Sequence, residues 1–150
     1  MSLEIIINQE IKTAMLAKDE VGLRSLRAIK SAIIIAKTAE GAKGTEMSND
    51  EEIKLLQKLV KQRKDSLEIF EKQNRPELAA KEKEEIVVIE KFLPIQLSDE
   101  DLKQQIAEII KTLGVTNATE MGKVIGVANK QLAGIAEGKR ISLMVKELLS

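Results

Sequence analysis

The sequence predicts an all-α protein, with an N-terminal helical domain that contains a long helical hairpin and a small C-terminal three-helix bundle. Three observations predict this fold class. Strong helix formers dominate the 150 residues. Apolar residues recur at steps of three, four and seven, without the alternation that marks strands. Helix caps and prolines then divide the pattern into segments of ordinary helix length.

The N-terminal domain, residues 1–94, is predicted to begin with two helices. The first runs from about residue 3 to residue 17, where apolar side chains follow one stripe. Asp19 is a suitable N-cap for the second helix, because its carboxylate can accept a hydrogen bond from a free amide of the first turn. Residues 40–45 contain two glycines and little to bury, so we expect a flexible connection there.

The long hairpin follows this connection. Ser48 and Glu51 have the spacing of a capping box, in which each side chain bonds the backbone amide of the other. Pro76 is expected to open the next helix, because a proline at the first helical position removes no hydrogen bond. That helix is predicted to continue to about Phe92 and to pack antiparallel to the helix before it.

A break at Pro94 separates the C-terminal domain, residues 95–150, because a proline disfavours helix in the residue before it. Gly114 and Gly138 are placed at helix ends, where glycine can take a left-handed conformation. The three helices of this domain are expected at residues 99–113, 118–132 and 139–149.

The composition excludes several kinds of chemistry. The chain has no histidine and no cysteine, so it cannot form a Ser-His-Asp triad, a cysteine nucleophile, a disulfide or an ordinary zinc or iron–sulfur site. No phosphate-binding or dinucleotide glycine motif is present. We therefore predict no catalytic residue, no metal site and no cofactor.

The charge balance and the few aromatic residues bear on nucleic-acid binding. The chain has 24 basic and 24 acidic residues, which argues against a globally basic binder. Its aromatic residues are two phenylalanines, which argues against a platform for stacking bases.

The sequence also bears on localisation. It has no run of about 18 apolar residues and no signal-peptide pattern, so no membrane partner is expected. The absence of cysteine is typical of a reducing compartment, and the predicted localisation is cytoplasmic.

Basic residues cluster locally in the long hairpin. Between Glu52 and Asp65 there are five basic residues and no acidic one. They form either a ridge that contacts phosphates or a solvated helix face paired with acids from a neighbour, and the residues alone favour the second interpretation. The five candidates are Lys54, Lys58, Lys61, Arg63 and Lys64.

The C-terminal domain has a second basic set. Gly122 and Gly126 lie inside a predicted helix and each costs about 1 kcal/mol relative to alanine, so they serve either tight helix packing or the approach of a ligand backbone. Gly134 and Gly138 bound a turn that is either an ordinary connection or an anion site at a helix start. The basic candidates are Lys123, Lys130, Lys139 and Arg140.

Four motifs, in this order, resemble the GatB/YqeY family over essentially the whole chain. Residues 95–150 also resemble the tail domain of the B subunit of the glutamine-dependent tRNA amidotransferase. The motifs are Lys61-Gln62-Arg63-Lys64-Asp65-Ser66-Leu67-Glu68-Ile69-Phe70, Phe92-Leu93-Pro94-Ile95-Gln96-Leu97, Met121-Gly122-Lys123-Val124-Ile125-Gly126 and Gly134-x-Ala136-x-Gly138.

The resemblance implies a cytoplasmic accessory protein that associates with tRNA or other structured RNA and has no complete catalytic site of its own. An amidotransferase or another protein is an expected partner, and family members often carry the label of a carbon–nitrogen ligase with glutamine as amido-N-donor. Ala133 and Ile135 stand where the family often has basic residues, so we expect weaker RNA binding. The alternative function is that of a protein-interaction or regulatory helical module.

Overall fold

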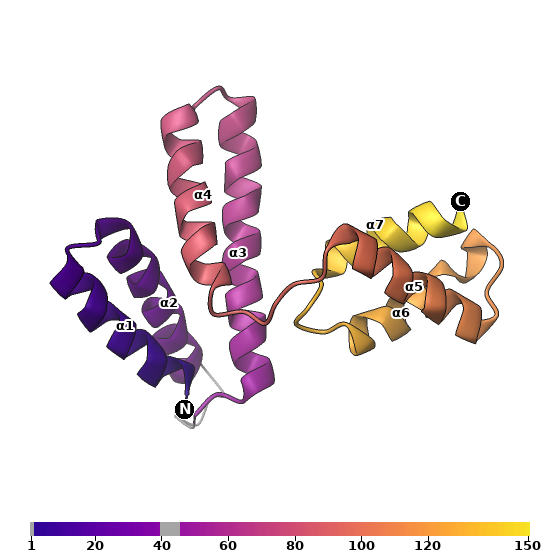
Figure 1. The fold of residues 1–150 in the computed structure, drawn as a ribbon, viewed down its shortest axis with the longest axis horizontal. Helices are drawn as coiled ribbons and strands as arrows, with labels where there is room; N and C mark the ends of the chain where they lie inside the picture. Colours follow the sequence, from indigo (N-terminus) through magenta and orange to yellow (C-terminus); the bar gives the residue numbers. More distant parts are fainter. Residues whose placement is uncertain (1, 40–45) are drawn as a thin grey trace. The chain divides into compact units, whose positions relative to one another are not determined.

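The computed structural model describes residues 2–39 and 46–150, which form seven α-helices and one short 3-10 helix and contain no strand (Figure 1). The predicted all-α fold class is confirmed. The chain divides into two compact units, Met1–Leu93 (unit 1) and Pro94–Ser150 (unit 2). The sequence placed the boundary one residue later. The expected connection at residues 40–45 lies outside the described residues.

Unit 1 begins with helices α1 (Leu3–Ala17) and α2 (Glu20–Thr38), which pack against each other. Asp19 caps α2 as predicted, because its Oδ1 atom accepts a hydrogen bond of 3.0 Å from the amide of Gly22. The turn between the two helices passes through Lys18, which has a φ of 55°. The sharp reversal therefore depends on one left-handed residue and one cap.

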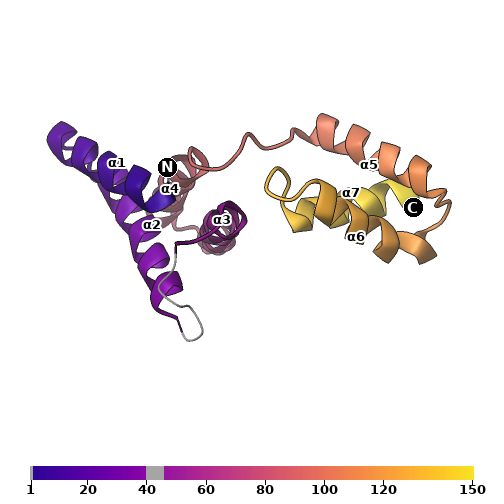
Figure 2. The ribbon, with the colours of Figure 1, turned by 90° about the horizontal axis from the view of Figure 1, so that it is seen from below.

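Helices α3 (Asn49–Lys72) and α4 (Pro76–Glu90) form the predicted antiparallel hairpin (Figures 1 and 2). Ser48 and Glu51 make both hydrogen bonds of the capping box, and Pro76 lies at the start of α4. Helix α4 ends two residues before the predicted Phe92, because residues 91–93 form a turn in which the Leu93 amide donates to Glu90.

The core of unit 1 lies where α2 packs against the α3–α4 hairpin and against α1. Its apolar side chains come from all four helices, so the core joins the two helix pairs into one unit. The largest fully buried side chains are Ile7, Ile29, Ile33, Leu56 and Ile89.

Unit 2 is a three-helix bundle of α5 (Asp99–Leu113), α6 (Met121–Gln131) and α7 (Gly138–Leu149), with the 3-10 helix η1 (Ala118–Glu120) before α6. The predicted helix at 118–132 therefore starts as a 3-10 turn. The buried core of unit 2 consists of Leu102, Ile106, Ile109, Val115, Val124, Ala128, Leu132, Ala136, Ile141 and Val145.

Two glycines were expected to take a left-handed conformation in unit 2. Gly114 does so, with a φ of 67°, and ends α5. Gly138 does not, since it is the first residue of α7, and the left-handed glycine of that connection is Gly134, with a φ of 84°. The chain turns four residues earlier than predicted because the segment after Gly134 packs Ala136 into the core before α7 begins.

A short segment fastens the start of unit 2 to the connection between α6 and α7. The Leu97 amide donates to the Ile135 carbonyl at 2.8 Å, and the Gln96 side-chain amide donates to the Gly134 carbonyl at 2.8 Å. Arg140 Nη2 in turn donates to the Leu97 carbonyl at 2.8 Å. We call residues 96–97 the strap, because they hold the start of unit 2 against the α6–α7 connection, ahead of its first helix.

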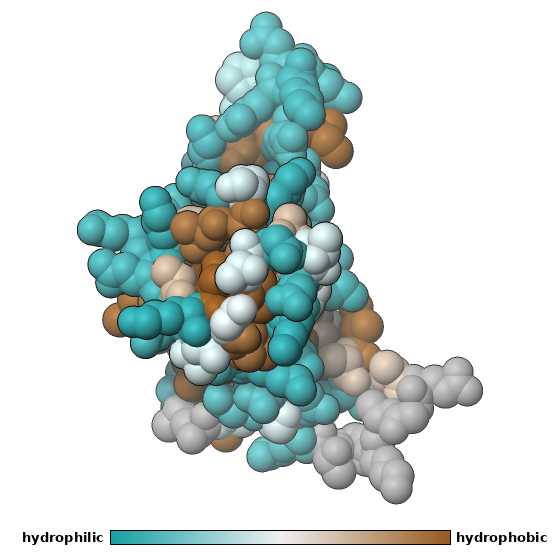
Figure 3. Space-filling view, turned by 90° about the vertical axis from the view of Figure 1, so that its right-hand side faces the viewer, coloured by the Kyte–Doolittle hydropathy of each residue, from teal (hydrophilic) through white to brown (hydrophobic). Residues whose placement is uncertain are grey.

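The surface of unit 2 is mixed. Figure 3 looks at the end of this unit and shows a brown apolar area surrounded by hydrophilic residues. Several apolar residues around the core, among them Met121 and Ile125, are partly buried. No helix in the described part of the chain is both long and apolar enough to cross a membrane.

Candidate nucleic-acid interface

The structure divides the basic cluster of α3 into two groups. Lys54, Lys58 and Lys61 are exposed and lie on one side of the helix, as their spacing of four and three residues requires. No acidic side chain among the described residues forms an ion pair with any of the three. We call Lys54, Lys58 and Lys61 the α3 ridge.

The other two members of the cluster, Arg63 and Lys64, pair with acidic residues of α4. Arg63 Nη1 donates to the Leu59 carbonyl at 3.1 Å, and Arg63 Nη2 lies 3.8 Å from Glu85 Oε1. Lys64 Nζ lies 3.8 Å from Glu90. Arg63 and Lys64 therefore follow the second interpretation, in which the basic residues pair with acids of a neighbouring helix. The α3 ridge, in contrast, is exposed to solvent.

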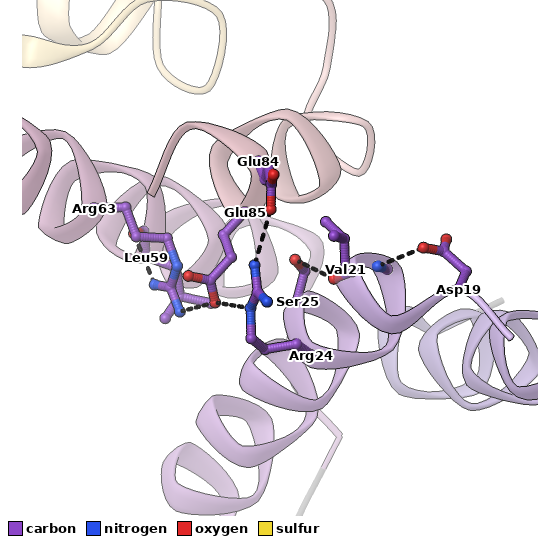
Figure 4. Close-up of polar contacts among 9 residues, drawn as sticks. Asp19, Val21, Arg24, Ser25, Leu59, Arg63, Glu84 and Glu85 are labelled. Atoms are coloured by element: carbon purple, nitrogen blue, oxygen red, sulfur yellow. Dashed lines mark hydrogen bonds and ion pairs between the residues drawn. The ribbon is translucent and has the colours of Figure 1, made fainter. Parts of the chain in front are cut away.

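Glu85 joins three helices through its carboxylate (Figure 4). The same oxygen that faces Arg63 lies 3.8 Å from Arg24 Nε of α2, and Arg24 Nη2 also bonds Glu84 at 3.2 Å. The Arg63 and Glu85 side chains are only 16% and 15% exposed, so water screens their attraction weakly. This cluster holds α2 and α3 against α4, and both of its arginines are already paired with glutamates of α4.

Glu82, one turn before Glu85 on α4, has a raised pKa. Burial of its carboxyl is the main cause and the negative charge of Glu85 adds to it, while Arg63 and Arg24 act in the opposite direction. A carboxyl whose pKa is raised by folding stabilises the native state when protonated. That contribution is complete below the ordinary pKa and is lost as the pH rises through the raised pKa.

Glu82→Gln is therefore expected to raise the free energy of unfolding at pH 7 slightly, because glutamine places no negative charge beside Glu85 in this partly buried position. The gain should vanish near pH 3.5, where Glu82 itself is protonated. Urea unfolding at both pH values measures this difference. Glu84→Gln is the matched control, because it removes the ion pair with Arg24 and should give no gain at pH 7. A gain that persists at pH 3.5 would contradict the assignment.

The exposed side of α6 carries two glycines beside two lysines. Gly122, Lys123, Gly126 and Lys130 are all exposed, and we call these four residues the α6 face. A Cβ atom added at Gly122 or Gly126 would have nothing within 4 Å. Within unit 2, the two glycines therefore do not serve tight packing against another helix, which was one of the two interpretations.

The remaining basic candidates differ in their surroundings. Lys139 is exposed at the start of α7, beside Gly138, where an added Cβ would lie 3.8 Å from Asn129 Oδ1. Arg140 bonds the Leu97 carbonyl and, at 2.9 Å, the Asp99 carboxylate, and its side chain is 28% exposed. Arg140 thus supports the strap, and we leave it out of the interface.

Gly134 likewise serves the fold, because it is buried and its carbonyl accepts the Gln96 side chain. Asn129 is a residue that the sequence analysis missed. It is exposed on the same side of α6, three residues after Gly126, so helical spacing from the glycines was the signal that pointed to it.

Within the described residues, no group of three or more acidic side chains gathers in a way that could hold a metal ion. The arrangement offers two exposed lysine surfaces, one in each unit. Lysines in this setting can bind anions such as phosphate groups as point charges.

Comparison with known proteins gives a consistent family match. The family model described as Yqey-like protein matches residues 5–149. Three similar curated proteins are each named "Altered inheritance of mitochondria protein 41, mitochondrial". The protein of Clavispora lusitaniae is 34% identical over 128 residues, which is 83% of this chain and 72% of that protein.

The other two relatives are matched over a smaller share of their length. The protein of Lachancea thermotolerans is 31% identical over 115 residues, 74% of this chain and 59% of that protein. The protein of Saccharomyces cerevisiae strain YJM789 is 34% identical over 112 residues, 72% of this chain and 58% of that protein. The chain thus spans a little over half the length of these two relatives.

The names of the relatives correct the predicted localisation. They are called mitochondrial, so the prediction of a cytoplasmic protein is wrong on this comparison. The absence of cysteine was a weak basis for that prediction, because a chain without thiols is indifferent to the redox state of its compartment.

Proposed function

The chain belongs to the YqeY-like family, and from that premise we propose that it is an accessory protein that holds structured RNA, with tRNA as the expected class, by its sugar–phosphate backbone. The observation that carries this proposal is a pair of exposed lysine surfaces, the α3 ridge and the α6 face, for which the described residues supply no acidic partner. In this proposal the chain binds RNA, and any chemistry on that RNA belongs to a partner.

The three lysines of the α3 ridge are spaced along the helix so that they can contact phosphates of one backbone segment. Lys54 and Lys61 are seven residues apart, so the ridge extends over about 10 Å of helix. Contacts of this kind position a protein on a nucleic acid without reading bases. The two phenylalanines of the chain, Phe70 and Phe92, are both partly buried, so neither offers an open platform for stacking. Binding through backbone and shape favours folded RNA over single strands.

The α6 face adds room for close approach. Helical glycines lower helix stability by about 1 kcal/mol each, and nothing in unit 2 makes use of the space that they leave. A phosphate backbone could lie against the bare helix at Gly122 and Gly126 with Lys123 and Lys130 beside it. The resemblance of residues 95–150 to the amidotransferase tail domain supports tRNA as the ligand and an amidotransferase as a partner.

A second candidate function, a protein-interaction module, is favoured by exposed apolar side chains in unit 1. Leu16 of α1 is 87% exposed and Ile35 of α2 is 68% exposed. Large apolar residues at such exposure occur at contact surfaces as well as singly on ordinary surfaces. A pull-down that recovers one defined protein and survives nuclease treatment would favour this candidate over RNA binding.

Titration of a fluorescein-labelled tRNA transcript at several salt concentrations tests the RNA proposal. Binding should weaken with salt, and Lys58→Glu and Lys123→Glu should each lower affinity about tenfold at low salt and reduce the salt slope by roughly 0.7–0.9 for each lost phosphate contact. Lys12→Glu on α1 and Lys103→Glu on α5 are matched controls, because both lysines are exposed and lie off the two surfaces.

Two outcomes would overturn the proposal. One is the absence of tRNA binding at low salt. The other is an equal loss of affinity in the controls and in the surface variants, which would show a response to net charge alone.

A further inference from the structure

We propose that the α3 ridge and the α6 face bind one RNA molecule at the same time, and that the short joint between the units makes the second contact intramolecular. This inference rests on the proposed function and names its ligand more closely. The expected ligand is a folded RNA that presents two separate backbone segments.

Each unit has a binding surface that is independent of its own fold. The α3 ridge belongs to unit 1 and the α6 face to unit 2, and the lysines of both are exposed and make no described ion pair. None of these lysines takes part in a core or in the strap. Either surface can therefore be disabled without disturbing the other.

The joint between the units is short because both sides of it are anchored. On the unit 1 side, Phe92 and Leu93 pack against the core, and the Leu93 amide bonds the Glu90 carbonyl at 3.1 Å. On the unit 2 side, the strap holds Gln96 and Leu97. Pro94 and Ile95 remain between them, both exposed, with Ile95 at 95%, and the Pro94 carbonyl accepts a hydrogen bond of 2.7 Å from the Gln96 side-chain amide.

A tether of two residues keeps the second surface close once the first has bound. Short flexible tethers correspond to effective concentrations in the millimolar range, and two linked sites can exceed the affinity of either alone by a factor of about 10²–10⁴. Two or three lysines alone make a weak site at physiological salt. Joint binding thus allows a chain with no net charge to hold RNA, provided that one molecule reaches both surfaces.

The test lengthens the joint in the full chain. A 30-residue Gly-Ser segment is inserted between Pro94 and Ile95, and binding of a fluorescein-labelled tRNA transcript is measured at low salt. We expect the affinity to fall about 60-fold, because the tether becomes about 16 times longer and effective concentration decreases with roughly the 3/2 power of tether length. The same segment added after Ser150 is the control and should leave the affinity unchanged.

A second comparison separates joint binding from damage to the fold. In a chain that carries Lys123→Glu and Lys130→Glu, only the α3 ridge remains, and the insertion should then have no effect on affinity. Circular dichroism melting checks that unit 1 and unit 2 unfold as in the parent chain.

The outcomes distinguish this inference from the proposed function. If the parent chain binds tRNA and the insertion changes nothing, joint binding is wrong and RNA binding stands. If the insertion weakens binding equally in the chain with only the α3 ridge, joint binding is also wrong. If the parent chain binds no tRNA, both proposals fail.

Discussion

Arg63→Met is expected to lower the free energy of unfolding by about 2 kcal/mol. The variant removes the hydrogen bond to Leu59 and one of the two guanidinium groups that face the Glu85 carboxylate. Removal of one partner of a buried ion pair costs about 3–5 kcal/mol. We expect less here because Arg24 still faces Glu85 and because Arg63 Nε is buried without a hydrogen-bond partner, a cost that methionine removes.

Lys64→Met is the matched control for this variant. Lys64 is the next residue of α3 and also pairs with an acid of α4, but its side chain and that of Glu90 are 45% and 41% exposed. Exposed pairs of this kind contribute about 0–1 kcal/mol. Urea unfolding followed by circular dichroism compares the two. Equal losses, or a gain for Arg63→Met, would show that the cluster at Glu85 does not hold α3 on α4.

The tRNA affinity of Arg63→Met gives a second readout. Arg63 lies on the side of α3 that faces α4, away from the α3 ridge, so the folded variant should bind tRNA as the parent chain does. A loss of affinity without a loss of stability would instead return Arg63 to the set of RNA contacts that the sequence predicted.

Features of the fold that depend on neighbouring residues were predictable from the sequence. The cap at Asp19, the capping box at Ser48 and the helix start at Pro76 all involve partners within a few residues, and each is present. The strap was not predictable, because the Gln96 side chain bonds a carbonyl 38 residues away and Arg140 one 43 residues away. A single sequence shows no sign of such distant pairs.

The sequence identified the basic residues of the candidate interface, but it could not show which of them are paired with acids of a neighbouring helix. Helical spacing already placed Lys54, Lys58 and Lys61 on one face, but the sequence could not show that Arg63 and Lys64 lie beside acids of α4. For the glycines of α6, the sequence showed their cost to helix stability and left two explanations open. The open space at both Cβ positions excludes tight packing within unit 2, and only the structure could show this because the surroundings of a helix are not written in its own sequence.

Gly122→Ala with Gly126→Ala is expected to stabilise unit 2 by about 2 kcal/mol, since alanine favours helix over glycine by about 1 kcal/mol and an added methyl group meets no atom at either position. For a unit of this size, the gain corresponds to about 10 °C in the melting temperature. Gly114→Ala is the matched control. It also has open space around it, but its φ of 67° makes alanine unfavourable, so this variant should lose about 1 kcal/mol.

The same double variant is expected to weaken tRNA binding at least tenfold, because two methyl groups hold an RNA backbone away from α6 and from Lys123 and Lys130. A gain in stability together with a loss of tRNA affinity would indicate that the glycines serve ligand binding. If they served only the fold, their replacement would lower stability and affinity together. Thermal melting and tRNA titration of the same preparation measure both. If stability rises and affinity is unchanged, the α6 face does not contact RNA at its glycines.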